Sequence, residues 1–183
     1  MNTHRDPETR IGYVYCDGSD WYNQTASQLL AALAKQMVAR KPKIPHALDD
    51  LYEFHKREDR RPNLGQIRSL LQSLCNESKR TFLVVDALDE CGSYTEREKL
   101  VSTLISLQSS SVKIIVSSRP NLEDLRRQFM QVPQIHIAAT DSDIQTYVHQ
   151  RLNENQDFNR RKIWTTRLEN QIVDTITESA SGM

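Results

Sequence analysis

Thr81-Phe-Leu-Val-Val-Asp86-Ala-Leu-Asp89-Glu90-Cys91 is the stretch of sequence that decides the fold. The apolar run from Phe82 to Val85 has no polar alternation, which is typical of a parallel strand covered on both faces. Three carboxylates follow directly, at the strand end where open α/β sheets bind their ligands. A single Asp here would favour a helix cap, but three clustered acids favour a bound cation such as Mg²⁺ with nucleotide phosphates.

A second apolar strand ends in polar groups further along the chain. Val112-Lys-Ile-Ile-Val is followed by the hydroxyls of Ser117 and Ser118, the guanidinium of Arg119, and Pro120. The spacing between Asp86 and Arg119 accommodates one strand-helix-strand crossover. We therefore expect the two strands to be parallel neighbours.

Together, the acidic strand end and the strand that closes in Ser-Ser-Arg-Pro resemble two motifs of a known family. They are similar to the Walker B and sensor motifs of the NACHT-type ATPase module, in the STAND class of P-loop NTPases. The resemblance is to the nephrocystin-like N-terminal branch, common in fungal ankyrin-repeat and WD-repeat proteins. It extends over nearly the whole chain, including Gly12 to Asp17 and Ala138 to Tyr147.

The resemblance implies a role for each polar residue, with ATP and Mg²⁺ as cofactors. Asp86 would hold Mg²⁺, and Asp89, or failing that Glu90, would orient and deprotonate the attacking water. Arg119 would sense the γ-phosphate, with Ser117 or Ser118 assisting. The alternative for Arg119 is a salt bridge to a nearby surface carboxylate.

The phosphate-binding loop of that family is not found in this sequence. No G-x-x-x-x-G-K-[ST] occurs, and none of the five glycines precedes a lysine. The expected fold is α/β, a three-layer P-loop NTPase-like, mostly parallel sheet that lacks the central phosphate-loop strand. We expect a module truncated on its N-terminal side, with weak or absent ATP binding and no hydrolysis by this chain alone.

The resemblance implies one partial NACHT-like NTPase domain over residues 1–183, and hydrophobic periodicity predicts the elements within it. We expect a strand at 11–16, the Walker B strand at 81–86, the sensor strand at 112–117 and a last strand at 134–138. Helices are expected at 24–37, 46–56, 63–74, 93–107 and 121–129, and C-terminal helices across 141–179. The resemblance places the missing phosphate-loop strand between the strands at 112–117 and 134–138.

Two functions remain open from the sequence. The chain is a fragment of an ATPase switch from a larger signalling protein, or a degenerate scaffold that binds no nucleotide. The expected partners are the missing P-loop segment, C-terminal helical or repeat domains, and another copy of the chain through self-association. The 24 basic and 24 acidic residues cancel, which argues against nucleic-acid or membrane partners. Three widely spaced cysteines, Cys16, Cys75 and Cys91, indicate packed, reduced thiols and a cytoplasmic location.

Overall fold

The computed structural model of the chain describes residues 8–20, 22, 24–39, 41, 43–120, 122–154 and 165–180. These residues form two compact units, Met1–Gln128 and Phe129–Met183, which we call unit 1 and unit 2. The single partial domain over residues 1–183 stays a prediction beside this division into two compact units.

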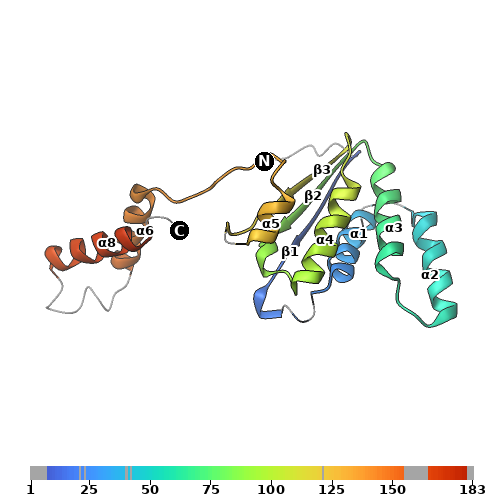
Figure 1. Ribbon diagram of the computed structural model, residues 1–183, viewed down its shortest axis with the longest axis horizontal. Coiled ribbons are helices and arrows are strands. Elements are labelled where there is room, and N and C mark those ends of the chain that lie inside the picture. The colour runs from blue at the N-terminus through green and yellow to red at the C-terminus, as the bar shows by residue number, and fades with distance from the viewer. Residues whose placement is uncertain are drawn as a thin grey trace. The chain divides into compact units, whose positions relative to one another are not determined.

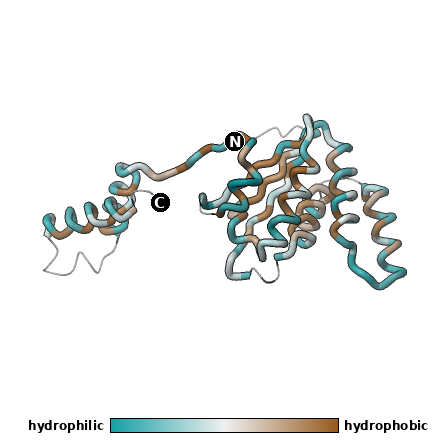
Figure 2. The backbone as a smooth tube through the Cα atoms, viewed as in Figure 1, coloured by the Kyte–Doolittle hydropathy of each residue, from teal (hydrophilic) through white to brown (hydrophobic). Residues whose placement is uncertain are grey.

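Unit 1 is built on a parallel sheet of three described strands (Figure 1). These are β1 (Thr9–Tyr15), β2 (Arg80–Asp86) and β3 (Val112–Val116), in the order β1-β2-β3. The register aligns Tyr13 with Val84 and Val84 with Ile115. The acidic strand is therefore central, and the predicted α/β class with a parallel sheet is confirmed. Figure 2 shows the hydrophobic residues concentrated along these strands.

Three helices cover one face of the sheet. They are α1 (Ala26–Val38), α3 (Leu64–Asn76) and α4 (Tyr94–Leu107), and α1 lies against β1 and contacts the other two helices. Gly12 permits this approach, since a Cβ at that position would lie 3.2 Å from the Leu33 side chain of α1. The core between the helices and the sheet includes Leu30, Leu33, Leu71, Leu74, Leu83, Val85, Leu100 and Leu104.

Local sequence explains why these helices begin where they do. Thr25 and Asn63 each form a complete capping box, with Gln28 and Gln66 three positions later. Ser93 caps α4 through its hydroxyl, which accepts a hydrogen bond from the Glu96 N–H. The helices therefore start at signals that the sequence makes visible.

The opposite face of the sheet is only partly covered. Tyr13, Tyr15 and Ile115 are 48%, 66% and 57% exposed, and all three lie on this face. The predicted three-layer arrangement is thus not confirmed within the described part of unit 1. One reason is that α2 (His46–Glu58) packs against α3 instead of against the sheet.

The two edges of the sheet differ. On β1, the Gln36 side chain forms two hydrogen bonds with the backbone groups of Tyr13 that point away from β2. It accepts from the Tyr13 N–H at 3.0 Å and donates to the Tyr13 carbonyl at 2.6 Å. On β3, strand alternation directs the N–H and C=O groups of Ile114 and Val116 away from β2. No further strand pairs there among the described residues. The edge at β3 is open, whereas the edge at β1 is blocked by a side chain.

Unit 2 contains two described helices, α6 (Asp141–Glu154) and α8 (Thr166–Ala180), which pack against each other. Val148 and Val173 are buried, and Thr140 and Asp143 form reciprocal hydrogen bonds at the start of α6. The helices predicted across 141–179 correspond to this pair, with residues 155–164 outside the described range.

The prediction of a strand at 134–138 is wrong. These residues form no strand, and Ile135 and Ile137 are 87% and 92% exposed. Alternating apolar residues form a strand only when a neighbouring strand accepts their hydrogen bonds, and no described strand lies beside this segment.

None of the helices in the described ranges has both the length and the apolar character needed to span a bilayer.

Candidate functional site

The candidate site begins at a strained turn after β2. Ala87 has φ 53° and ψ 46°, a left-handed conformation that costs an L-residue about 1–2 kcal/mol. This turn leads directly into the short 3-10 helix η2 (Leu88–Glu90), which carries two of the three acids. Such strain persists only where surrounding contacts fix the backbone, as they often do at functional sites.

Ser117 supplies those contacts from the end of β3. Its hydroxyl donates to Oδ1 of Asp86 and accepts from the Ala87 N–H at 3.0 Å. Its carbonyl accepts from the Leu88 N–H at 2.9 Å. One residue therefore fixes both the first acid and the turn that follows it.

Arg119 joins the other two acids. Its backbone N–H donates to Oδ1 of Asp89 at 3.1 Å, and its Nε lies 3.6 Å from Oδ2 of the same residue. Its Nη2 donates to Oε1 of Glu90 at 2.9 Å. The Arg119 side chain is 72% exposed, while that of Asp89 is only 10% exposed. The ion pair that the sequence left as the alternative for Arg119 is therefore present, and the acids involved are those of the predicted site.

Ser118 behaves differently from its neighbours. Its hydroxyl donates to the carbonyl of Arg119 at 3.0 Å rather than to a carboxylate. The structure thus brings together Asp86, Asp89, Glu90, Ser117 and Arg119, and it places the Ser118 hydroxyl on the backbone of the same loop. These positions leave the roles assigned from the family resemblance as predictions.

The loop after β1 also reaches the site. The N–H of Gly18, in η1 (Gly18–Asp20), donates to Oε2 of Glu90 at 3.0 Å, so Glu90 bridges this loop and Arg119. Nearby, two hydrogen bonds from Ser19 lower the pKa of Asp17. Sequence reasoning did not foresee the Gly18 contact, because it joins segments far apart in the chain.

Three buried residues, Cys16, Cys91 and Arg97, lie close to the acidic site. Interaction with Cys91 raises the pKa of the Cys16 thiol, whereas interaction with Cys16 and with the charge of Arg97 lowers the pKa of the Cys91 thiol. Arg97 in turn donates to Asp124 of α5 (Glu123–Gln128) at 2.9 Å. Only the apolar setting of the cysteines was visible in the sequence.

The carboxylates of the site are ligands of the type that Mg²⁺ binds, but they do not form a complete binding site. Carboxylate oxygens are the ligands that Mg²⁺ prefers, and it often takes one or two of them together with water and phosphate oxygens. The described residues include no group of three or more His, Cys, Asp or Glu side chains placed to hold a metal ion. Asp86 could therefore hold Mg²⁺ only with ligands from water or phosphate.

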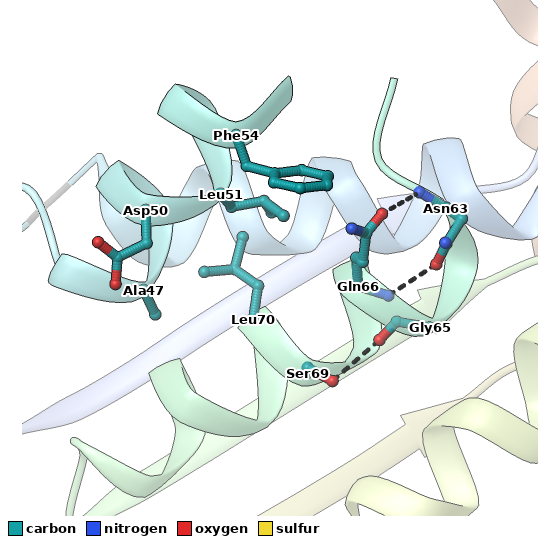
Figure 3. A pocket seen from close by; sticks show the side chains of 9 residues that line it. All are labelled: Ala47, Asp50, Leu51, Phe54, Asn63, Gly65, Gln66, Ser69 and Leu70. Atoms are coloured by element: carbon teal, nitrogen blue, oxygen red, sulfur yellow. Dashed lines mark hydrogen bonds between the residues drawn. The ribbon is translucent and has the colours of Figure 1, made fainter. Parts of the chain in front are cut away.

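An open groove of about 510 Å³ lies elsewhere, between α2 and α3 (Figure 3). Leu51 and Phe54 of α2 face Leu70 of α3, and Gln66 is hydrogen-bonded to Asn63 at one end. None of the predicted site residues lines this groove.

The parallel sheet with polar residues at the ends of β2 and β3 defines an α/β protein compatible with a P-loop-like fold. Residues 1–119, well over half of the chain, match the family described as Nephrocystin 3, N-terminal. The chain belongs to this family.

A curated relative supports a NACHT-related region. The chain is 26% identical over 149 residues to the vegetative incompatibility protein HET-E-1 of Podospora anserina. This alignment covers 78% of the chain but only 11% of the relative, so the chain spans a small part of that protein's length. No solved structure matches the chain.

Proposed function

We propose that the chain carries the magnesium-binding and phosphate-sensing part of a NACHT-type ATPase switch within a larger signalling protein. The observation that supports this most directly is the meeting of Asp86, Asp89 and Glu90 with Ser117 and Arg119. Family membership and the similarity to a vegetative incompatibility protein support the same class. By analogy, the switch would act in cytoplasmic self/non-self recognition.

Each residue has a proposed task in the complete module. Bound ATP with Mg²⁺ would supply the phosphoanhydride bond whose hydrolysis resets the switch. Asp86, with Oδ1 held by Ser117, would offer its other oxygen to the cation. Asp89 or Glu90 would orient water and accept its proton. Arg119, which is largely exposed, would leave its carboxylate partners to bind a phosphate.

The phosphate loop would come from another segment of the parent protein. The open edge of β3 supports this proposal, because the outward backbone groups of Ile114 and Val116 can accept a further strand. The hydrogen bonds of Gln36 with the Tyr13 backbone make β1 the less suitable edge for an added strand. The remaining partners that we propose are C-terminal helical or ankyrin-type or WD-type repeat domains, which would transmit the nucleotide state.

Nucleotide titration tests the proposal. A fluorescent ATP analogue with Mg²⁺ should bind the 183-residue chain with a Kd of about 1 mM or weaker. A longer polypeptide from the same gene that adds a G-x-x-x-x-G-K-[ST] segment should bind at least about tenfold more tightly, a gain of about 1.4 kcal/mol. In that polypeptide, Asp86→Asn should remove the part of the affinity that depends on Mg²⁺. Glu98→Gln, an exposed position on α4, is the matched control.

One observation favours the scaffold alternative. Arg119 already compensates the charges of Asp89 and Glu90, and Ser117 satisfies one oxygen of Asp86. In this alternative, the contacts have a purely structural role, which is to hold the end of β3 against the turn after β2. Equal nucleotide affinity of the two polypeptides, or an Asp86→Asn effect on stability alone, would favour this alternative. Micromolar binding by the 183-residue chain would contradict the need for a phosphate loop.

A further inference from the structure

Helix α2 leaves an apolar surface of unit 1 uncovered. This helix packs against α3 and lies away from the sheet (Figure 1). Phe54 of α2 lines the groove between the two helices, yet 54% of it is exposed (Figure 3). A large apolar side chain beside an open groove is typical of a surface that binds another protein.

The groove has room for an aromatic side chain. It encloses about 510 Å³, and its α3 wall includes the small residues Gly65 and Ser69. A Cβ at Gly65 would meet only Oδ1 of Asn63, at 3.4 Å, which is an ordinary contact. Leu51 and Leu70 provide apolar surface in the same groove (Figure 3). A ring from another molecule can therefore enter between the helices.

Two charged residues lie on the same side of α2 as Phe54. Asp50 is one turn before Phe54 and Arg57 is one turn after it, so the three residues form one stripe along the helix. Asp50 lines the groove at the end opposite Asn63 (Figure 3). Both charged residues are exposed, and neither has an ion-pair partner in the described part of the chain. The stripe therefore presents a carboxylate and a guanidinium that are available to another molecule.

This stripe is complementary to itself when two copies of α2 lie antiparallel. A twofold axis near Phe54 would bring Asp50 of each copy opposite Arg57 of the other. Apart from Glu58, the acidic residues of α2 precede Phe54, whereas its lysine and arginine follow Phe54. A parallel arrangement would instead bring like charges together. The charge pattern thus selects the antiparallel pair.

We propose that two copies of this chain form a symmetric dimer through α2 and α3. Phe54 of each copy occupies the groove of the other, and Asp50 and Arg57 form two reciprocal ion pairs across the interface. The two helices of each copy together form a four-helix contact. None of the acidic-site residues lines the groove, so this inference goes beyond the proposed function and does not require that the chain bind a nucleotide.

Sedimentation velocity of the 183-residue chain tests the proposal. At about 200 μM, most of the wild type should have about twice the 21.2 kDa mass of one chain, with a Kd on the order of 10 μM. Asp50→Arg and Arg57→Asp should each weaken association at least about tenfold, because each places like charges together twice in a symmetric interface. Phe54→Ala should weaken it similarly by removing the ring. Asp49→Arg makes the same charge change on another side of α2 and should remain dimeric.

A mixture of the two charge variants gives the sharpest comparison. Asp50→Arg presents two guanidinium groups in its stripe, and Arg57→Asp presents two carboxylates. An equimolar mixture should therefore form a heterodimer, although neither variant pairs with itself. The double exchange of Asp50→Arg with Arg57→Asp should restore the homodimer. Both results require folded variants, so they separate a lost interface from a lost fold.

Hydrogen exchange of the wild type gives a test that needs no variant. Raising the concentration should slow exchange in residues 46–58 and 64–70. A wild type that stays monomeric at the concentration used for sedimentation would overturn the proposal. So would charge variants that remain dimeric, a mixture that forms no heterodimer, or slower exchange confined to β3.

Discussion

The Glu96 carboxylate, in the first turn of α4, accepts a hydrogen bond at 2.9 Å from the backbone N–H of Ala26, the first residue of α1. Ser93 and Glu96 have the spacing of a capping box, but Glu96 caps the neighbouring helix rather than its own. One side chain therefore joins two of the three helices that cover the sheet.

Replacing Glu96 should weaken that junction. Glu96→Gln is expected to lower the free energy of unfolding by about 1 kcal/mol. The reason is that the backbone N–H of Ala26 and the ammonium group of Lys99 both lose a charged partner. Urea denaturation would measure the loss. Glu98→Gln, on an exposed side of the same helix, should change stability by less than about 0.5 kcal/mol.

The same residue predicts a pH dependence. Hydrogen bonds from Lys99 and from the Ala26 N–H lower the pKa of Glu96 below its usual 4.5. Its contribution is therefore complete above the unfolded-state value and is lost as the pH falls through the lower folded-state value. Between about pH 5 and pH 3, the wild type should lose more stability than Glu96→Gln. Parallel pH profiles for the two proteins would contradict this assignment.

Ala87 offers a test of the strained turn. Glycine adopts its left-handed conformation without steric cost, so Ala87→Gly should be neutral or stabilising by up to about 1 kcal/mol after the entropy cost of glycine. Ala87→Val should destabilise by at least about 1 kcal/mol, because a β-branched residue fits this conformation poorly. Chemical denaturation of both variants gives the comparison. A glycine variant less stable than the valine variant would show that the turn is not strained as described.

The ion pair between Arg97 and Asp124 should be costly to break from one side. The two side chains are 10% and 15% exposed, so Arg97→Ala leaves a buried carboxylate without its cation. We expect a loss of about 3 kcal/mol in the free energy of unfolding. Arg127→Ala, which removes an exposed pair with Glu123, is the matched control and should cost less than about 0.5 kcal/mol. Equal effects of the two substitutions would refute the distinction.

Asp89 and Arg119 should contribute unequally to stability. Arg119 is 72% exposed, so Arg119→Ala should cost no more than about 1 kcal/mol. Asp89 is largely buried and accepts a backbone N–H, so Asp89→Ala should cost about 1–3 kcal/mol. Thermal unfolding of both variants would give the order, and a larger effect of Arg119→Ala would reverse our view of the loop.

The sequence predicted elements whose signals are local or strongly patterned. The helices from Ala26, Leu64 and Tyr94 follow caps that lie within the same few residues. The apolar run ending at Asp86 has no reasonable place except inside a sheet. The approach of Ser117 and Arg119 to the acids was expected because neighbouring parallel strands end at the same side of a sheet.

Features that depend on contacts between distant residues were missed or wrong. The contact of Gly18 with Glu90 leaves no periodic signal in either segment. The exposed segment 134–138 has the alternation of a strand, but the described residues provide no partner for it. A strand is defined by its neighbour as much as by its own residues.

The unequal edges of the sheet restrict how copies of this chain can join. Because Gln36 occupies the outward backbone groups of Tyr13, β3 is the more accessible of the two edges in the described sheet, and two molecules would extend a common sheet most readily by bringing their β3 strands together. That union uses up the β3 edge of both molecules, and the Gln36 side chain of α1 hinders a third molecule at β1. Association by this route favours a closed pair over a growing fibril.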